Sequence, residues 1–144
     1  MILVDANLLL YAYNSEDQRH DTARRWLEET MSGSEEVRLA WVTILAFLRI
    51  GTNPRAFARP LSLAEAVEHV SEWLRHPMFA TVEPGERHWS ILAALLPATQ
   101  ARANLVMDAH LAVLAMEHGA TLCTTDKDFT RFRGLKLRYP LESH

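Results

Sequence analysis

The segment Met1–Tyr11 reads Met-Ile-Leu-Val-Asp-Ala-Asn-Leu-Leu-Leu-Tyr, and it decides the fold. The apolar run Ile2–Val4 is typical of a strand buried on both faces, as in parallel sheets. The pattern changes after Asp5, where Asn7 is a favourable N-cap and the residues that follow predict a helix. In open α/β sheets, ligands bind beyond the carboxyl ends of the strands. Asp is also ordinary in turns and caps, so this stretch alone leaves a site and a structural role open for Asp5.

The rest of the chain alternates strands with helices. Further strands are predicted at 37–42, 79–82, 120–124 and 135–139. Helices are predicted after Asp5, at 15–31, 43–50, from Ser62 to before Pro77, at 86–96 and 105–118, with a short turn or helix at 126–132. Ser62 and Glu65 form a capping box, Gly119 suits a helix C-terminus, and Leu45 is expected to point inward. The alternation implies one α/β domain over residues 1–144, with a parallel sheet covered by helices on both faces.

Composition and charge argue against several classes of protein. The formal net charge of −3 disfavours a non-specific polyanion binder but leaves room for a local basic patch. No basic segment precedes the first apolar run, and no apolar stretch approaches the roughly 20 residues that span a bilayer, so neither a secretory signal nor a membrane protein is expected. The single cysteine, Cys123, is interpreted as a buried structural thiol, which is compatible with a cytoplasmic protein.

Two further segments place acids at the ends of predicted elements. Asp108 lies in the first turns of an apolar helix, where the helix dipole favours an acid even without a function. Asp126 and Asp128 follow the fourth predicted strand, where acids are also ordinary at the start of a short helix. In a parallel sheet, however, Asp5 and Asp126 both lie at carboxyl ends of strands and therefore at one edge. Together these segments indicate a site more strongly than any one of them does alone.

Carboxylates that lie close together repel one another and resist joint ionisation. A hard divalent cation relieves that repulsion, and Mg²⁺ is the usual choice where phosphates are handled. Such a cation polarises a phosphodiester and lowers the pKa of a bound water. Other chemistries are less well supported, because the sequence has no Gly-rich phosphate loop, Cys123 has no matched catalytic partner, and the histidines show no close zinc-like pair.

The sequence resembles the PIN-domain family, and specifically the VapC-type toxin ribonucleases of bacterial toxin–antitoxin pairs. The resemblance covers nearly the whole chain and is strongest in three segments, namely VDANLL at 4–9, DAHLA at 108–112 and GATLCTTDKDF at 119–129. It implies a three-layer α/β/α sandwich with a mostly parallel sheet. It also implies a Mg²⁺- or Mn²⁺-dependent endoribonuclease that leaves a 3′-hydroxyl and a 5′-phosphate, a homodimer, and a cognate antitoxin that inhibits it.

The resemblance also assigns roles to individual residues of this sequence. It implies Asp5, Asp108 and Asp126 as metal ligands, with Asp128 as a fourth catalytic acid or support. Thr124 and Asn7 are expected to orient carboxylates or waters. Scattered basic residues are by default a solvated face, but near an acidic centre they contact RNA phosphates. The candidates for such contacts are Arg49, Arg55 and Lys127.

The sequence departs from the family at Ala46, where members usually carry a glutamate just before the Phe-Leu-Arg segment. Fewer acids mean weaker metal binding. This keeps open a second hypothesis, a catalytically weak or inactive module that binds RNA or a partner protein. A third hypothesis, an Asp phosphotransfer domain, ranks lower because Asn7 stands where an Asp-x-Asp motif would have its second acid.

Overall fold

The computed structural model describes residues 1–142, and its five strands form one sheet in the order β3-β2-β1-β4-β5, with every neighbouring pair parallel. The strands are β1 (Ile2–Val4), β2 (Val37–Ala40), β3 (Phe79–Val82), β4 (Thr121–Cys123) and β5 (Leu137–Arg138). The helices are α1 (Ala6–Tyr13), α2 (His20–Ser32), α3 (Trp41–Gly51), α4 (Leu63–Arg75), α5 (His88–Thr99), α6 (Asn104–His118) and the 3₁₀ helix η1 (Lys127–Arg131). The predicted α/β fold with a parallel central sheet is confirmed. The predicted single domain includes residues 143–144, which lie outside the described residues.

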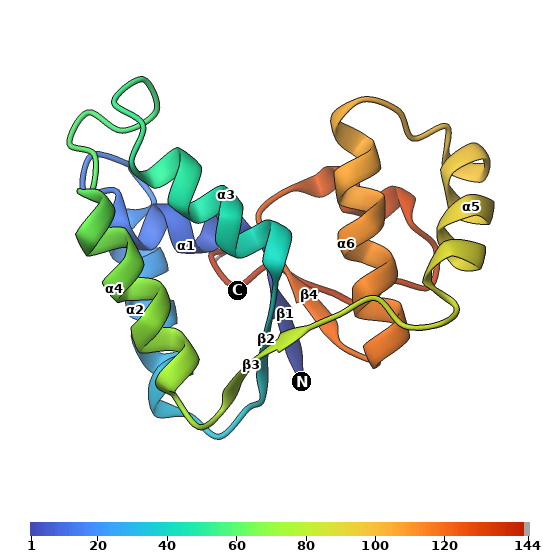
Figure 1. The fold of residues 1–144 in the computed structure, drawn as a ribbon, viewed down its shortest axis with the longest axis horizontal. Helices are drawn as coiled ribbons and strands as arrows, with labels where there is room; N and C mark the ends of the chain where they lie inside the picture. Colours follow the sequence, from blue (N-terminus) through green and yellow to red (C-terminus); the bar gives the residue numbers. More distant parts are fainter. Residues whose placement is uncertain (143–144) are drawn as a thin grey trace.

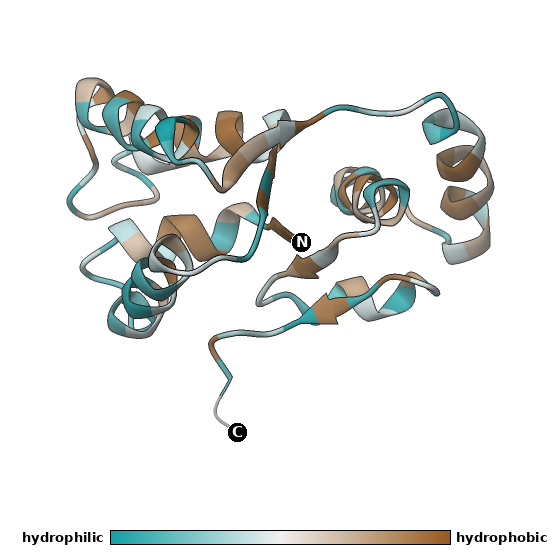
Figure 2. Cartoon of the chain, turned by 90° about the horizontal axis from the view of Figure 1, so that it is seen from below, coloured by the Kyte–Doolittle hydropathy of each residue, from teal (hydrophilic) through white to brown (hydrophobic). Residues whose placement is uncertain are grey.

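The helices cover the sheet in two separate layers. In Figure 1, α1 to α4 lie on one side of the strands and α5 and α6 on the other. The alternating residues of β1 separate accordingly, because Ile2 and Val4 belong to the core beneath α1 to α4 whereas Leu3 belongs to the core beneath α6. Figure 2, turned by 90°, shows brown apolar segments in the strands and in the helices on both sides. The architecture is therefore a three-layer α/β/α sandwich with β1 at its centre.

The parallel arrangement brings the carboxyl ends of β1 and β4 together. The Asp5 backbone N–H donates to the Cys123 carbonyl oxygen at 2.9 Å, which continues the pairing of the two strands by one step. The residues that follow both strands therefore meet at one edge of the sheet.

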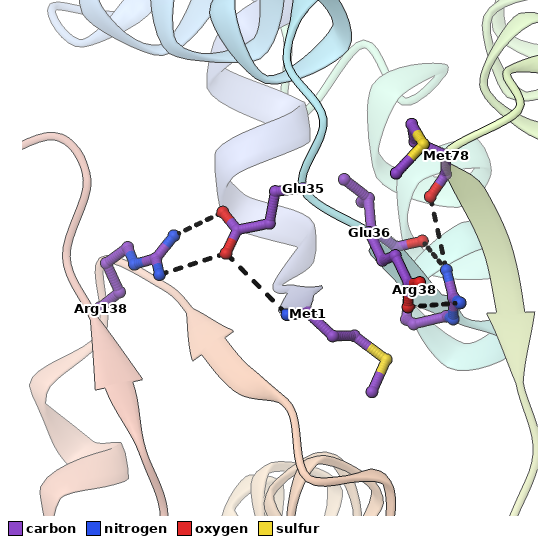
Figure 3. A network of polar contacts seen from close by, with 7 residues as sticks. Met1, Glu35, Glu36, Arg38, Met78 and Arg138 are labelled. Atoms are coloured by element: carbon purple, nitrogen blue, oxygen red, sulfur yellow. Dashed lines mark hydrogen bonds and ion pairs between the residues drawn. The ribbon is translucent and has the colours of Figure 1, made fainter.

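Ion pairs and side-chain hydrogen bonds also join the strands to the residues that precede β2 and β3. Figure 3 shows Glu35, which precedes β2, accepting two hydrogen bonds from Arg138 of β5 at 2.8 and 3.4 Å. It also shows Arg38 of β2 donating to Glu36 at 3.2 Å and to the Met78 carbonyl at 3.4 Å. These contacts connect strands that lie on both sides of β1.

The predicted capping features at two helix ends are confirmed. Ser62 and Glu65 exchange hydrogen bonds of 3.0 Å in a complete capping box at the start of α4. Gly119 ends α6 with φ of 64°, a left-handed conformation that glycine adopts at little cost.

Three local predictions are wrong. Helix α1 begins at Ala6, so Asp5 and not Asn7 is its N-cap, because the chain turns directly after the last hydrogen bond to β4. Helix α2 begins at His20, since the Asp17 carboxylate accepts the Arg19 N–H at 2.8 Å and forms a turn first. Helix α5 continues through Pro97 to Thr99, because a proline in the last turn loses a backbone hydrogen bond without ending the helix there.

None of the helices within residues 1–142 combines the length and apolar character that a membrane crossing requires.

Candidate active site

A buried hydroxyl connects two of the predicted acids. The Thr124 Oγ1 donates to Asp5 Oδ2 at 2.7 Å and accepts the Asp126 backbone N–H at 3.0 Å. Thr124 is fully buried directly after β4, so both hydrogen bonds are shielded from water. Asp126 caps η1, and its Oδ1 accepts the Asp128 N–H at 2.8 Å. The predicted orienting role of Thr124 therefore has a geometric basis for Asp5.

Asp5 and Asp108 line a common pocket of about 580 Å³, here called the acidic pocket. Its other lining residues come from α1, α3 and α6, namely Ala6, Val42, Thr43, Leu45, Ala46, Arg49, Met107 and Leu111. Ala46 thus faces the same space as the two aspartates. The expectation that Leu45 points inward is wrong, because 59% of Leu45 is exposed and it forms part of the pocket wall. The helical periodicity of α3 marked an apolar face, but it did not indicate that part of this face borders an open pocket.

The charges of four aspartates act on one another at this edge. The pKa of Asp108 is raised to about 6 by burial first, and then by the negative charges of Asp126, Asp5 and Asp128, while Arg131 opposes the rise. Burial also raises the pKa of Asp5 above its ordinary value, the hydrogen bonds from Thr124 and Ala6 lower it, and the charge of Asp126 raises it again. The sheet therefore gathers the four predicted acids into one electrostatic environment in which negative charge is in excess.

The donor atoms at this edge suit a hard divalent cation, since they are carboxylate oxygens, and burial together with the charges of the neighbouring aspartates raises the pKa of Asp108. However, residues 1–142 contain no group of three or more His, Cys, Asp or Glu side chains placed closely enough to hold a metal ion together. Mg²⁺ is commonly bound through one or two carboxylates, with water and substrate phosphate completing its coordination. Asp5 and Asp108 fit that mode of binding better than a preformed cage of three aspartates.

The predicted phosphate-binding residues differ in their surroundings. Arg49 lines the acidic pocket one turn after Ala46. Arg55 lies in the loop after α3, where its backbone N–H donates to Asn53 Oδ1 at 2.9 Å. Lys127, at the start of η1, forms an ion pair with Glu142 and lies 3.7 Å from the centroid of the Tyr139 ring. The predicted orienting role of Asn7 has no support in residues 1–142, where its side chain makes no hydrogen bond to any of the four aspartates.

One polar cluster outside the pocket was not predicted. His88 of α5 lies between two residues of α6: its Nδ1 is 2.5 Å from Glu117 Oε1 and its Nε2 is 2.9 Å from His110 Nδ1. The Gly85 N–H also donates to Glu117, at 3.1 Å. No spacing in the sequence indicates this contact, because it depends on how α5 packs against α6.

Comparisons with known proteins agree with this architecture. The PIN domain family matches residues 2–135. Ribonuclease VapC37 of Mycobacterium tuberculosis is 45% identical over 140 residues, covering 97% of each chain, and Ribonuclease VapC43 of the same species is 37% identical over 142 residues, covering 99% of this chain and 97% of that protein.

Similar folds occur in solved toxin–antitoxin assemblies. VapBC2 from Rickettsia felis, bound to a DNA fragment from its promoter, contains a chain with a TM-score of 0.68 and 16% identity, covering 96% of this chain and 98% of that one. FitAcB from Neisseria gonorrhoeae gives a TM-score of 0.60 at 19% identity, covering 97% and 98%. At sequence identities of 16% and 19%, these similarities show a common fold only. The match to the family and the extent of identity to the mycobacterial proteins place this chain in the PIN domain family, among the VapC ribonucleases.

Proposed function

We propose that this chain is the toxin of a toxin–antitoxin pair and acts as a Mg²⁺-dependent endoribonuclease, with Mn²⁺ as an alternative cation. The proposal rests on one observation: the negative charges of Asp5, Asp126 and Asp128 all act on Asp108. Asp5 and Asp108 also line a common pocket. An excess of negative charge at the carboxyl edge of a parallel sheet suits a cation and a phosphodiester. Membership among the VapC ribonucleases supports RNA as the substrate.

In this proposal Asp5 and Asp108 hold the cation, and the Thr124 hydroxyl fixes the Asp5 carboxylate. Asp126 and Asp128 increase the negative potential, and Asp126 lies close enough to influence both ligands. Arg49, on the α3 wall, contacts a phosphate oxygen of the bound strand and orients it. When bound, the cation supplies Lewis acidity toward the phosphodiester and the attacking water.

The proposed partners are RNA, a cognate antitoxin protein and a second copy of the chain in a dimer or a dimer-based complex with antitoxin. Support for the antitoxin comes from the fold neighbours, which are chains of VapBC and FitAB assemblies. The proposed compartment is the cytoplasm, where cellular RNA would be available to the enzyme.

Asp5→Asn tests the enzymatic proposal. The substitution keeps the shape of the side chain, so the fold should be retained while a metal-binding charge is lost. Cleavage of a pool of structured RNA in Mg²⁺ should fall by at least about a hundredfold, as expected when a group that acts in the transition state is removed. Asp21→Asn, at an exposed position of α2, is the matched control and should cleave like the wild type. Wild-type protein that cleaves no RNA in Mg²⁺ or Mn²⁺ would contradict the proposal.

A second candidate, a module that binds RNA or a protein without cleaving, is favoured by Ala46 in the pocket wall and by the lack of a preformed three-acid group within residues 1–142. Ala46→Glu separates the two candidates, because it places a third carboxylate in the acidic pocket. For an enzyme limited by cation affinity, this change lowers the Mg²⁺ concentration that gives half-maximal cleavage. For a binding module, Ala46→Glu creates no cleavage, and wild type and Asp5→Asn inhibit growth equally.

A further inference from the structure

A second, smaller pocket of about 210 Å³ opens at the same edge of the sheet and is here called the Tyr139 pocket. Its lining residues are Arg19, Thr124, Thr125, Tyr139, Leu141 and Glu142. Thr124 connects the two pockets, since its hydroxyl donates to Asp5 in the wall of the acidic pocket. The Tyr139 hydroxyl also approaches the Asp126 carbonyl, at 3.4 Å. Thr124 and Tyr139, which both line the second pocket, therefore connect it to Asp5 and Asp126 of the proposed reaction centre.

A lysine and a carboxylate meet at the rim of this pocket. Lys127 follows Asp126 directly in the chain, and its ammonium group pairs with Glu142 while lying over the Tyr139 ring at 3.7 Å. Arg19 differs, because its Nε and Nη2 donate to the two carboxylate oxygens of Asp17, two residues away, at 3.1 and 3.2 Å. Lys127, unlike Arg19, pairs with a residue of a different segment, because Glu142 follows β5.

The pair between Lys127 and Glu142 can be exchanged easily. Their side chains are 61% and 54% exposed, and ion pairs in such positions contribute little free energy because water and salt screen them. A phosphodiester oxygen offers the same ammonium group a charge-assisted hydrogen bond of similar kind. The Glu142 carboxylate thus occupies a position that an RNA phosphate can take.

We propose that the Tyr139 pocket binds the RNA phosphate next to the one that is cleaved, with Lys127 as its cation and Glu142 as the carboxylate that this phosphate replaces. The inference rests on the proposed function, because it requires an RNA strand whose scissile phosphate lies at Asp5 and Asp108. A strand in that position continues past Thr124 and Asp126 toward Lys127. Glu142 then acts as an internal competitor of substrate at this subsite.

The test measures RNA affinity without cleavage. The probe is a fluorescein-labelled pool of random single-stranded RNA, titrated by anisotropy with the Asp5→Asn protein in EDTA between about 50 and 200 mM KCl. Lys127→Met should weaken binding and reduce the slope of log affinity against log salt by about 0.7, the value for one phosphate contact on a single strand. Lys127→Arg should restore the slope, because it keeps the charge.

Glu142→Gln should strengthen binding by about two- to fivefold, the factor expected when an exposed ion pair no longer competes. The gain should vanish in the Lys127→Met background, because both changes act through one contact. The matched controls lie at the opposite edge of the sheet. Lys136→Met changes a residue just before β5, and Glu36→Gln removes the partner of Arg38 at 3.2 Å. Both should bind RNA with the affinity and the salt slope of the parent protein.

Two failures can be told apart. If the parent protein binds the RNA pool but Lys127→Met and Glu142→Gln leave affinity and slope unchanged, the subsite is wrong and the pocket accommodates only its own chain, while the proposed function stands. If the parent does not bind RNA at any salt concentration, RNA as the substrate is wrong, and the subsite fails with it.

Discussion

One hydroxyl group, that of Thr124, determines how the Asp5 carboxylate is presented. Thr124→Val keeps the volume but removes the donor to Asp5 and the acceptor for the Asp126 N–H. Because the Thr124 hydrogen bond lowers the pKa of Asp5, its loss should raise that pKa further. We expect the acidic limb of the pH–rate profile to move to higher pH, with a stability loss of about 1 to 3 kcal/mol for the unpaired groups. Thr124→Ser should restore the profile, and an unmoved limb in Thr124→Val would contradict this role.

Asp108 should make the metal-free protein less stable as the pH rises. Its folded-state pKa of about 6 lies above the ordinary 3.8, so the folded chain binds this proton more tightly than the unfolded chain does. The associated stabilisation is complete below pH 3.8 and is lost as the pH rises through 6. Asp108→Asn, which stays neutral, should therefore be more stable than wild type at pH 7.5 in EDTA, by about 1 kcal/mol for a carboxyl that solvent partly screens. Denaturant unfolding at pH 4 and 7.5 measures the difference, and equal curves for both proteins at both pH values would count against it.

At the scale of residues, the sequence predicted that Asp5 and Asp126 lie at one edge of the sheet, but it did not predict the pocket beside them. Asp5 and Asp126 follow apolar strands, so the parallel sheet places them at one edge. Leu45 was assigned to the core because helical periodicity records an apolar face without recording what lies against it. Here that face borders an open pocket and remains 59% exposed.

At the scale of elements, α5 depends on polar contacts with α6. Helix α5 is mostly apolar, yet among its residues only His88 is buried. Glu117→Ala should leave His88 Nδ1 and the Gly85 N–H without their partner and cost about 2 kcal/mol of stability. Glu68→Ala, at an exposed position of α4, breaks a surface pair with Arg75; it is the control and should change stability by less than about 0.5 kcal/mol. If both substitutions change the free energy of unfolding equally, the buried cluster contributes no more stability than a surface ion pair.

Elements that rest on local signals were predicted well, and those that depend on packing were not. The strand Phe79–Val82 and the capping box at Ser62 are recognisable from a few neighbouring residues. Helix α5 was predicted to end at Pro97, but it continues for two residues because a proline near a C-terminus removes a single hydrogen bond. The contact between His88 and Glu117 spans 29 residues and has no local signature.

At the scale of the whole molecule, the site lies where the two cores meet, since β1 contributes Ile2 and Val4 to one core and Leu3 to the other. A cation bound by Asp5 and Asp108, as proposed, should therefore stabilise the complete fold. Millimolar Mg²⁺ or Mn²⁺ should raise the melting temperature by about 3 °C for each kcal/mol of binding free energy. Fluorescence and circular dichroism should report the same shift, and Asp108→Asn should abolish it. No shift in the wild type would argue against a cation site at this edge.

The order of the strands also has a consequence for the time at which the protein becomes active during its synthesis. Asp5 directly follows β1, but the hydroxyl that positions it belongs to Thr124, 119 residues later. At ordinary rates of translation this interval lasts roughly 6 to 24 s. Throughout it, the growing chain lacks β4, Asp126 and the completed edge of the sheet. The proposed nuclease site therefore cannot be completed before Thr124 has been synthesised and β4 has paired with β1.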